Sequence, residues 1–271
     1  MEPLIIANEE IKWQKWDFVN VPNHKTGKEI KKRQLVTFFT PAQQLFVQLL
    51  DELQFLLYHL FVASWQQNQF RQLNNRPPEK TVVLTKDFAE NFSCFSQNEI
   101  QGAHWAKDSV TIHPVIARYQ CKNQECNNSM VDDIIDIISN DLQHDVHAVQ
   151  KFTEVIIKFL REERGIDVEK MFILSDGCAA QYKSKVAFLD SSMSEVDNNI
   201  KSEKAFYGSR HGKNRCDGEG GVIKSKAARI IRNGGLINSA KDLYQQCLCL
   251  QKELTNPDGT CNHNRRKINL G

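Results

Sequence analysis

The sequence predicts an α/β protein in which helices flank a mixed β-sheet and a long N-terminal helix precedes that sheet. Leucines recur at helical spacing over residues 41–73, short β-branched runs begin at residue 80, and amphipathic stretches separate the later runs. Apolar residues make up 41% of the 271 residues and charged residues 25%, a mixture typical of globular proteins. This composition excludes the collagen-like, coiled-coil and wholly disordered classes.

Properties of the whole chain exclude further classes. There are 35 Lys and Arg against 33 Asp and Glu, and the net charge of +2 does not by itself indicate a polyanionic partner. No run approaches about 18 uninterrupted apolar residues, and Glu2 and Pro3 follow Met1 where a signal peptide has a basic start and an apolar core. We therefore expect neither secretion nor a membrane partner. We expect most of the eight cysteines to be free thiols in a reducing compartment.

The N-terminal segment, residues 1–75, is expected to hold a basic, irregular, solvated stretch followed by one long helix. Thr40 and Pro41 form an N-cap and a first-turn proline, and the apolar spacing then continues for more than 30 residues. The aromatic and apolar content of this helix indicates that two of its faces are buried, against the sheet or against another copy of the chain. Pro77 and Pro78 end the segment.

Residues 76–255 are predicted to form the core, and residues 256–271 a polar tail. Strands are expected at residues 80–85, 109–119, 168–174 and 205–209, and helices at residues 146–164, 179–188, 220–232 and 239–254. Residues 130–138 fit a helix face as well as a buried strand, and we favour the strand. A polar stretch separates the second helix from the last strand at residues 191–202, and Pro114 indicates an edge strand or a bulge. This order of elements is an RNase H-like layout.

Three acidic residues lie at the boundaries of predicted strands or helices. Asp87 and Asp176 each follow an apolar strand, and Asp217 opens a helix after a glycine-containing loop. Hard divalent cations prefer oxygen ligands, and a pair of them about 3.5–4 Å apart can serve phosphoryl transfer. The alternative for each aspartate is an ordinary turn or helix-capping role.

Three blocks of sequence resemble, in order, those of a transposon-derived family of mostly uncharacterised invertebrate proteins. They are residues 87–93 (DFAENFS), 175–183 (SDGCAAQYK) and 211–221 (HGKNRCDGEGG). That family resembles DDE-type transposases with an RNase H-like core. The present chain departs from it at Asn214, where the family has glycine, and 271 residues leave no obvious separate domain to recognise transposon ends.

The resemblance implies a catalytic triad of Asp87, Asp176 and Asp217 that binds two Mg²⁺ or Mn²⁺ ions and cuts or joins DNA in the nucleus. Glu219 is the alternative third carboxylate. The chain would be active, or a truncated or domesticated copy. Two alternatives remain open: an inactive DNA-binding or protein-interaction module, and an RNase H-like nuclease of other specificity. A homo-oligomer is also compatible with the long helix.

Basic residues surround the third block. Eight Lys and Arg stand against two acids between residues 204 and 232, and such clusters bind phosphates. The candidate DNA-binding residues are His211, Lys213, Arg215, Lys224, Lys226 and Arg229. The alternative is a solvated helix face. A contrasting acidic segment is expected to face solvent, with Asp141 or Asp145 as a possible extra neighbour of the metals; it comprises Asp132, Asp133, Asp136, Asp141 and Asp145.

Three cysteine spacings resemble halves of zinc sites, since zinc takes Cys and His in sets of four. They are Cys121-x4-Cys126, Cys247-x-Cys249 and Cys261-x-His263. None has the compact CxxC spacing of a zinc ribbon, and Cys249 is expected to pack within an apolar helix. The sequence leaves open whether any of them binds zinc.

Overall fold

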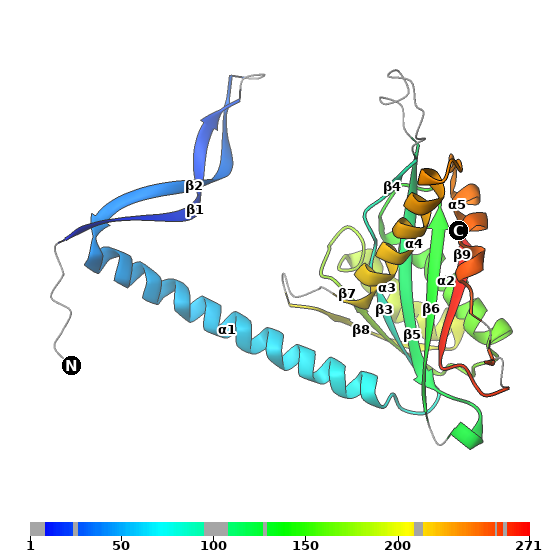
Figure 1. Cartoon of the computed structure of the whole chain (residues 1–271). Coiled ribbons are helices and arrows are strands. Elements are labelled where there is room, and N and C mark those ends of the chain that lie inside the picture. The colour runs from blue at the N-terminus through cyan, green and yellow to red at the C-terminus, as the bar shows by residue number, and fades with distance from the viewer. Residues whose placement is uncertain are drawn as a thin grey trace. The chain divides into compact units, whose positions relative to one another are not determined.

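The chain consists of two compact units, Met1–Val62 and Ala63–Gly271, in a computed structural model (Figure 1). The structure describes residues 9–23, 27–94, 108–126, 129–208, 214–252, 254–256 and 259–271. The division falls inside the long helix rather than at Pro77, because the helix packs on the second unit from Ala63 onward. Ala63 is buried, and the ring of Phe70 lies 5.1 Å from that of Tyr207.

The first unit begins with a β-hairpin, so the prediction of an irregular N-terminal stretch is wrong. β1 (Glu10–Pro22) and β2 (Glu29–Pro41) pair antiparallel over their whole length. Trp13 stacks on Phe38 with ring centroids 4.7 Å apart, and its indole N–H donates to the hydroxyl of Thr40 at 2.9 Å. The basic residues of β2 are exposed, which is compatible with a strand that has solvent on one side.

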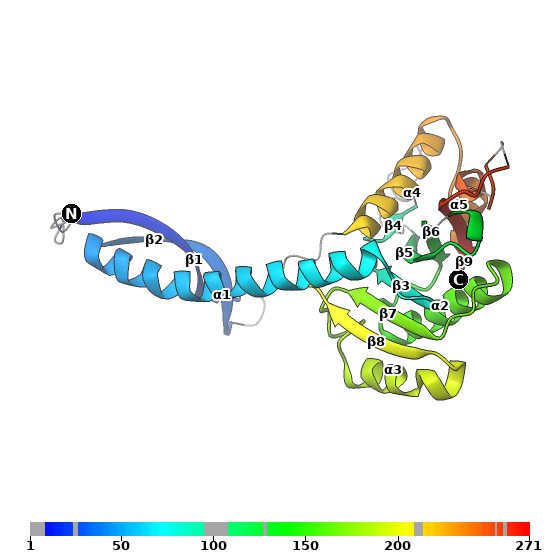
Figure 2. The same ribbon diagram turned by 90° about the horizontal axis from the view of Figure 1, so that it is seen from below.

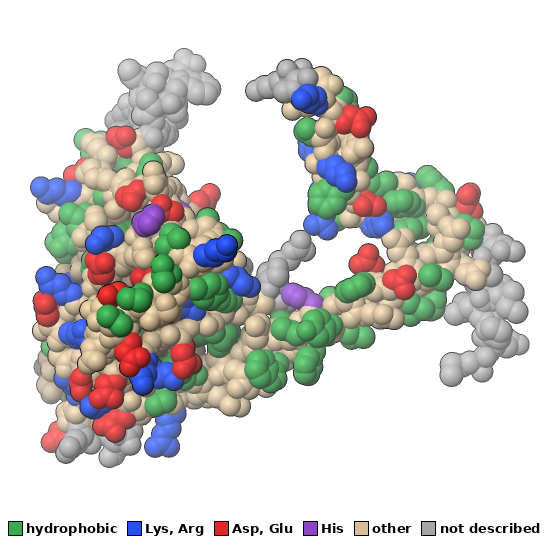
Figure 3. Space-filling view, turned by 180° about the vertical axis from the view of Figure 1, so that it is seen from behind, with side chains coloured by type: hydrophobic (Ala, Val, Ile, Leu, Met, Phe, Trp, Pro, Cys, Tyr) green, Lys and Arg blue, Asp and Glu red, His purple; other side chains and the backbone are tan. Residues whose placement is uncertain are grey.

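The predicted long helix is confirmed as α1 (Ala42–Asn75). Among its described residues only Ala63 is buried within the chain, so the two buried faces that we expected are not covered here. Figure 3 shows hydrophobic side chains exposed along this helix; they include Phe46, Leu49, Leu50, Phe55, Leu56, Leu57, Tyr58, Leu60, Phe61 and Trp65. An 18-residue window reaches a mean hydropathy of 1.4, so α1 is long and apolar enough to cross a membrane by length and composition. The absence of a membrane partner stays a prediction.

The second unit is built on a seven-stranded mixed sheet, as predicted. Its strands lie in the order β8-β7-β3-β5-β6-β9, with β4 paired to β5. β3, β5 and β6 form an antiparallel meander, and β7 and β8 continue it on the other side, both parallel to β3. This is the RNase H-like order. The strand bounds are β3 (Thr81–Lys86), β4 (Phe92–Ser93), β5 (Ser109–Gln120), β6 (Met130–Ser139), β7 (Lys170–Ser175), β8 (Lys201–Phe206) and β9 (Asn264–Leu270).

Pro114 lies in a strand with neighbours on both sides, so the predicted edge position is wrong. Its carbonyl accepts from the amide of Asp87 at 3.4 Å, which means that its nitrogen faces the same side. β3 has already ended there, at Lys86 opposite Val115. The missing N–H of proline therefore removes no rung of the β3–β5 ladder.

Helices cover both faces of the sheet (Figure 2). α2 (Val146–Lys158), followed by a π turn (Phe159–Glu163), buries one face, and α4 (Arg215–Arg232) and α5 (Ala240–Cys247) bury the other. α3 (Lys185–Asn198) runs through most of the stretch predicted to be polar loop. The described residues also include two short 3-10 turns, Gln124–Cys126 and Leu248–Leu250. Cys249, in the second, is exposed, so the prediction that it packs within a helix is wrong.

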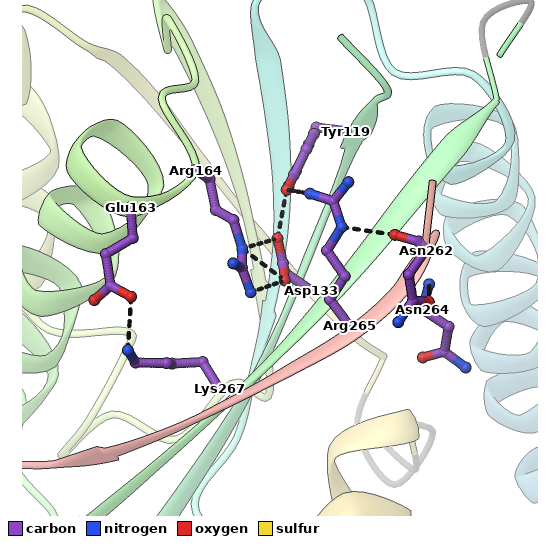
Figure 4. Close-up of polar contacts among 8 residues, drawn as sticks. All are labelled: Tyr119, Asp133, Glu163, Arg164, Asn262, Asn264, Arg265 and Lys267. Atoms are coloured by element: carbon purple, nitrogen blue, oxygen red, sulfur yellow. Dashed lines mark hydrogen bonds and ion pairs between the residues drawn. The ribbon is translucent and has the colours of Figure 1, made fainter. Parts of the chain in front are cut away.

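The predicted polar tail supplies the edge strand β9, parallel to β6. This strand places Arg265 and Arg266 beside the acidic segment, which is why Asp133 and Asp136 are buried instead of facing solvent. Asp133 accepts three bonds from the Arg164 guanidinium, at 3.0, 3.1 and 3.2 Å, and one from the hydroxyl of Tyr119 (Figure 4). Asp136 lies 3.5 Å from Arg266.

Candidate functional site

Asp87 and Asp176 lie side by side at the C-terminal ends of two neighbouring inner strands of the sheet. Each directly follows its strand, and β3 and β7 pair in parallel with Thr85 opposite Leu174. The carboxyl ends of neighbouring parallel strands are a common place for binding and catalytic groups. Asp176 is held in place locally, since its Oδ1 accepts from the amide of Cys178 at 3.1 Å.

Asn214 connects the start of α4 to Asp87. Its Oδ1 caps α4 by accepting from the amide of Cys216 at 2.7 Å, and its own amide donates to Asp217 Oδ2 at 3.0 Å. Its Nδ2 donates to Asp87 Oδ2 at 3.2 Å. One side chain thus ties the helix that carries Asp217 to the acid at the end of β3.

The three aspartates affect one another electrostatically. Burial, followed by the negative charges of Asp176 and Asp217, raises the pKa of Asp87 to about 6, from an ordinary 3.8. Burial, followed by the charges of Asp87 and Asp176, also raises the pKa of the Tyr182 phenol well above its ordinary value. The site is therefore a partly buried region of unbalanced negative charge, which a divalent cation would neutralise.

An aromatic and imidazole wall lies behind Asp87. The Tyr182 hydroxyl is 3.2 Å from Nε2 of His113, and the ring of Phe88 contacts that of His113 at 4.5 Å between centroids. His113 is fully buried, and burial lowers its pKa well below the ordinary value, so the imidazole is neutral at pH 7. Phe88, His113 and Tyr182 are thus uncharged at pH 7, so the charge at this site belongs to the aspartates.

Carboxylate oxygens are the ligand type that Mg²⁺ and Mn²⁺ prefer, so the donor set fits such ions. Their spacing is open. Among the described residues, one group of at least three Cys, His, Asp or Glu has all its ligand atoms within 4.8 Å of one another, and it consists of cysteines and a histidine. The three aspartates do not form a second such group. The ligand oxygens of Asp87, Asp176 and Asp217 are therefore not all within 4.8 Å of one another in this structure.

The other predicted acids have partners elsewhere. Glu219 pairs with Arg266 of β9. Asp145 caps α2 by accepting from the amides of His147 and Ala148, both at 2.9 Å, and Asp141 Oδ1 accepts from the amide of Gln143 at 2.9 Å. These are the capping and turn roles that short acidic side chains commonly have.

The candidate DNA-binding residues are only partly described. His211 and Lys213 lie outside the described residues. Arg215 pairs with Asp132 at 2.5 Å, and Lys224 lies 3.8 Å from Glu90. Lys226 is half-buried and Arg229 is exposed on α4. A cavity of about 320 Å³ next to Asn214 is lined also by Arg215, Arg118, Asp132 and Tyr207, so two arginines face the space beside the acidic site.

Sequence reasoning missed Asn214, Tyr182 and His113. Asn214 had a usable signal, because an asparagine followed three residues later by an acid is the pattern of a capping box. The other two had none: Tyr182 and His113 meet across 69 residues of sequence.

Replacing Asp87 by asparagine is expected to stabilise the protein at pH 8, without added divalent cations, by about 1 kcal/mol after allowance for solvent screening of a half-buried group. The folded chain binds more protons than the unfolded chain between pH 3.8 and about 6, so wild-type stability falls as the pH rises through that window. Urea denaturation from pH 4 to 8 should show that the difference in unfolding free energy between the two proteins grows as the pH rises to about 6 and is constant above that. An equal gap at pH 4 and pH 8 would contradict the shifted pKa.

Comparison with known proteins places the chain in a family. Neither the curated proteins nor the solved structures contain a match to it. A family model does match, over residues 66–258, which span the RNase H-like unit from the end of α1 to the loop before β9 and include all three aspartates. The chain therefore belongs to the family described as Domain of unknown function (DUF8701).

Proposed function

We propose that this protein cleaves DNA phosphodiesters, and joins strands, in a reaction that depends on Mg²⁺ or Mn²⁺. The observation that carries the proposal is the placement of Asp87 and Asp176 at the ends of adjacent parallel strands, with Asp217 linked to Asp87 through Asn214. The RNase H-like strand order and the resemblance of the three sequence blocks to DDE-type transposases support it.

The side chains have distinct roles in this proposal. Asp87, Asp176 and Asp217 hold the cations, which would activate the attacking oxygen and stabilise the leaving oxygen. Asn214 orients Asp87, and the amide of Cys178 orients Asp176. Glu219 is less suited to be the third acid, because it pairs with Arg266 and is not among the charges that raise the pKa of Asp87.

The substrate is DNA in this proposal because α4, which carries Asp217 in its first turn, also carries cations farther along the helix. Lys224, Lys226 and Arg229 lie on the same helix as Asp217, and cations contribute most of the affinity for a phosphate backbone. The exposed apolar surface of α1 supports a homo-oligomer. From the proposed action on DNA we also infer a nuclear location.

Cleavage of supercoiled plasmid tests the proposal. With Mg²⁺ or Mn²⁺ the wild type should nick or linearise the plasmid, and Asp176→Asn should lower the rate at least about 100-fold, as the loss of a group essential to the transition state does. Asp197→Asn is the matched control, because Asp197 is exposed on α3. Equal activity of wild type and Asp176→Asn would defeat the proposal.

A second candidate is a DNA-binding module that does not cut. The resembled family has glycine at position 214, and this departure favours the second candidate. The Asn214 Nδ2 bond that orients Asp87 in the first proposal also occupies Asp87 Oδ2, which leaves Oδ1 for a cation. Salt-sensitive DNA binding that is independent of metal, with no cleaved product, would support this function. Cleavage of an RNA–DNA hybrid in preference to duplex DNA would support an RNase H-like nuclease of other specificity.

A further inference from the structure

Two of the cysteine half-sites meet in space. The ligand atoms of Cys121, Cys126, Cys261 and His263 all lie within 4.8 Å of one another, although 135 residues separate Cys126 from Cys261 in the sequence. Tetrahedral zinc with Zn–S bonds of about 2.3 Å holds its ligand atoms about 3.8 Å apart. The observed cluster is therefore close to the dimensions of a four-coordinate site, and we propose that it binds one structural Zn²⁺.

The backbone presents the first pair of ligands in a tight turn. Cys121 follows β5, and Cys126 ends the 3-10 turn that leads back toward β6. The amide of Cys121 donates to the carbonyl of Ser129 at 2.8 Å, and the amide of Cys126 donates to the carbonyl of Asn123 at 3.0 Å. These bonds close the loop so that both sulfur atoms face the same side.

The second pair arrives on the segment that leads into β9. Cys261 bridges antiparallel to Thr255, and the carbonyl of His263 accepts from the amide of Asp132 at 2.9 Å. Arg265, just beyond, donates to the carbonyl of Asn262 at 2.6 Å and to the Tyr119 hydroxyl at 3.3 Å (Figure 4). The Cys-x-His segment is thus fixed against the β5–β6 hairpin from both sides.

Two polar atoms point to a metal ion. Nε2 of His263 is buried and has no hydrogen-bond partner among the described residues, a costly state for a ring nitrogen. Nδ2 of Asn123 lies 3.4 Å from Sγ of Cys261 and donates to it. Donors around the sulfur atoms are the usual second shell of a thiolate ligand.

The ligand types select the ion. Three sulfurs and one imidazole form a Cys₃His set, which is typical of structural zinc and unlike the oxygen ligands of Mg²⁺. All four ligands come from the protein, so no position remains open for substrate. The cysteine–histidine cluster also lies away from the aspartates. β3 and β5 are antiparallel, with Lys86 opposite Val115 and Val83 opposite Arg118. Cys121 therefore lies near the start of β3, whereas Asp87 follows its end. Its role is to fasten the segment before β9 to the hairpin.

Metal analysis of the full chain, purified under reducing conditions from zinc-supplemented medium, tests this proposal. We expect about one zinc per wild-type chain, and almost none in Cys126→Ser or His263→Ala. Cys249→Ser is the matched control, because Cys249 is exposed and outside the cluster, and it should keep its zinc. Replacing zinc by Co²⁺ should produce the visible absorption of a tetrahedral thiolate site in the wild type and in the control.

Two further variants keep the test decisive if the first two fail to fold. His263→Cys preserves four ligands and should retain zinc, whereas Asn123→Ala preserves all four ligands but should bind zinc about 10–100-fold more weakly. Wild-type protein that holds no zinc, that holds iron instead, or that shows a disulfide among Cys121, Cys126 and Cys261 would overturn the proposal. Zinc retained equally in Cys126→Ser and wild type would do the same. None of these results depends on DNA cleavage.

Discussion

Replacing Arg164 by methionine is expected to lower the free energy of unfolding by about 3–5 kcal/mol, because it removes the cation that hydrogen-bonds to a buried carboxylate. Arg265 lies opposite Asp133 on β9, but its guanidinium donates to Asn262 and Tyr119 instead. Asp133 is fully buried, and Arg164 donates to both of its oxygens. The Tyr119 hydroxyl remains as a donor to Asp133 but carries no charge. Urea denaturation of wild type and variant at pH 7 measures the difference.

An exposed ion pair is the matched control for Arg164→Met. Lys158 and Glu162 lie 3.9 Å apart on the same helical segment, and both side chains are exposed. Lys158→Met should therefore cost no more than about 0.5 kcal/mol. Adding Asp133→Asn to Arg164→Met should recover part of the loss, since it removes the unpaired charge. If Arg164→Met costs no more than Lys158→Met, the buried pair does not stabilise the fold as proposed.

The central strands and the helices that cover them could be predicted because their local patterns are strong. The β-branched run at Thr81–Lys86 and the apolar face of α2 each bury side chains that any soluble fold must cover. The order of these elements also predicted the RNase H-like sheet. α4 begins five residues before its predicted start, because glycines weaken the helical pattern there and the capping box at Asn214 overrides them.

The strand β9 could not be predicted from local pattern. Its sequence, NRRKINL, has three consecutive cations and reads as a solvated tail. Its arginines are buried because Asp133 and Asp136 lie on the adjacent strand β6, more than 120 residues earlier. The acidic segment was misinterpreted for the same reason. The acidic residues of β6 and the basic residues of β9 each look solvent-exposed when their segment is considered alone. Only the pairing of β6 with β9 makes the burial of both sets of charges tolerable.

The candidate site was predictable in part. Asp87 and Asp176 could be found because an acid directly after an apolar strand is a local signal. The sequence could not separate Asp217 from Glu219, since they are two residues apart on one helix. The structure gives them different partners, Asn214 for Asp217 and Arg266 for Glu219. Cys126 lies close to Cys261 because strand β9, which was not predicted, brings the two segments together. The sequence shows each pair of possible zinc ligands but not which pairs are close in space.

Replacing Lys86 by methionine is expected to remove a pH dependence of stability worth about 1.4 kcal/mol per pH unit between pH 7 and 10.5. Lys86 ends β3 with only 1% of its surface exposed, and its Nζ donates to the Thr153 hydroxyl oxygen at 2.7 Å. Burial, followed by the positive charge of Lys204, lowers the pKa of Lys86 to about 7. In this window the unfolded chain binds more protons than the folded chain, so wild-type stability rises with pH.

The methionine variant should therefore be the more stable protein at pH 7, and its advantage should shrink by about 2 kcal/mol by pH 9. Thr153 tolerates the change, because its hydroxyl donates to the carbonyl of Val149 at 2.6 Å and keeps that bond. Urea denaturation of both proteins from pH 6 to 9 gives the two curves, with Lys151→Met on the exposed face of α2 as the control that should parallel the wild type. Parallel curves for Lys86→Met and wild type would mean that the folded protein keeps Lys86 charged.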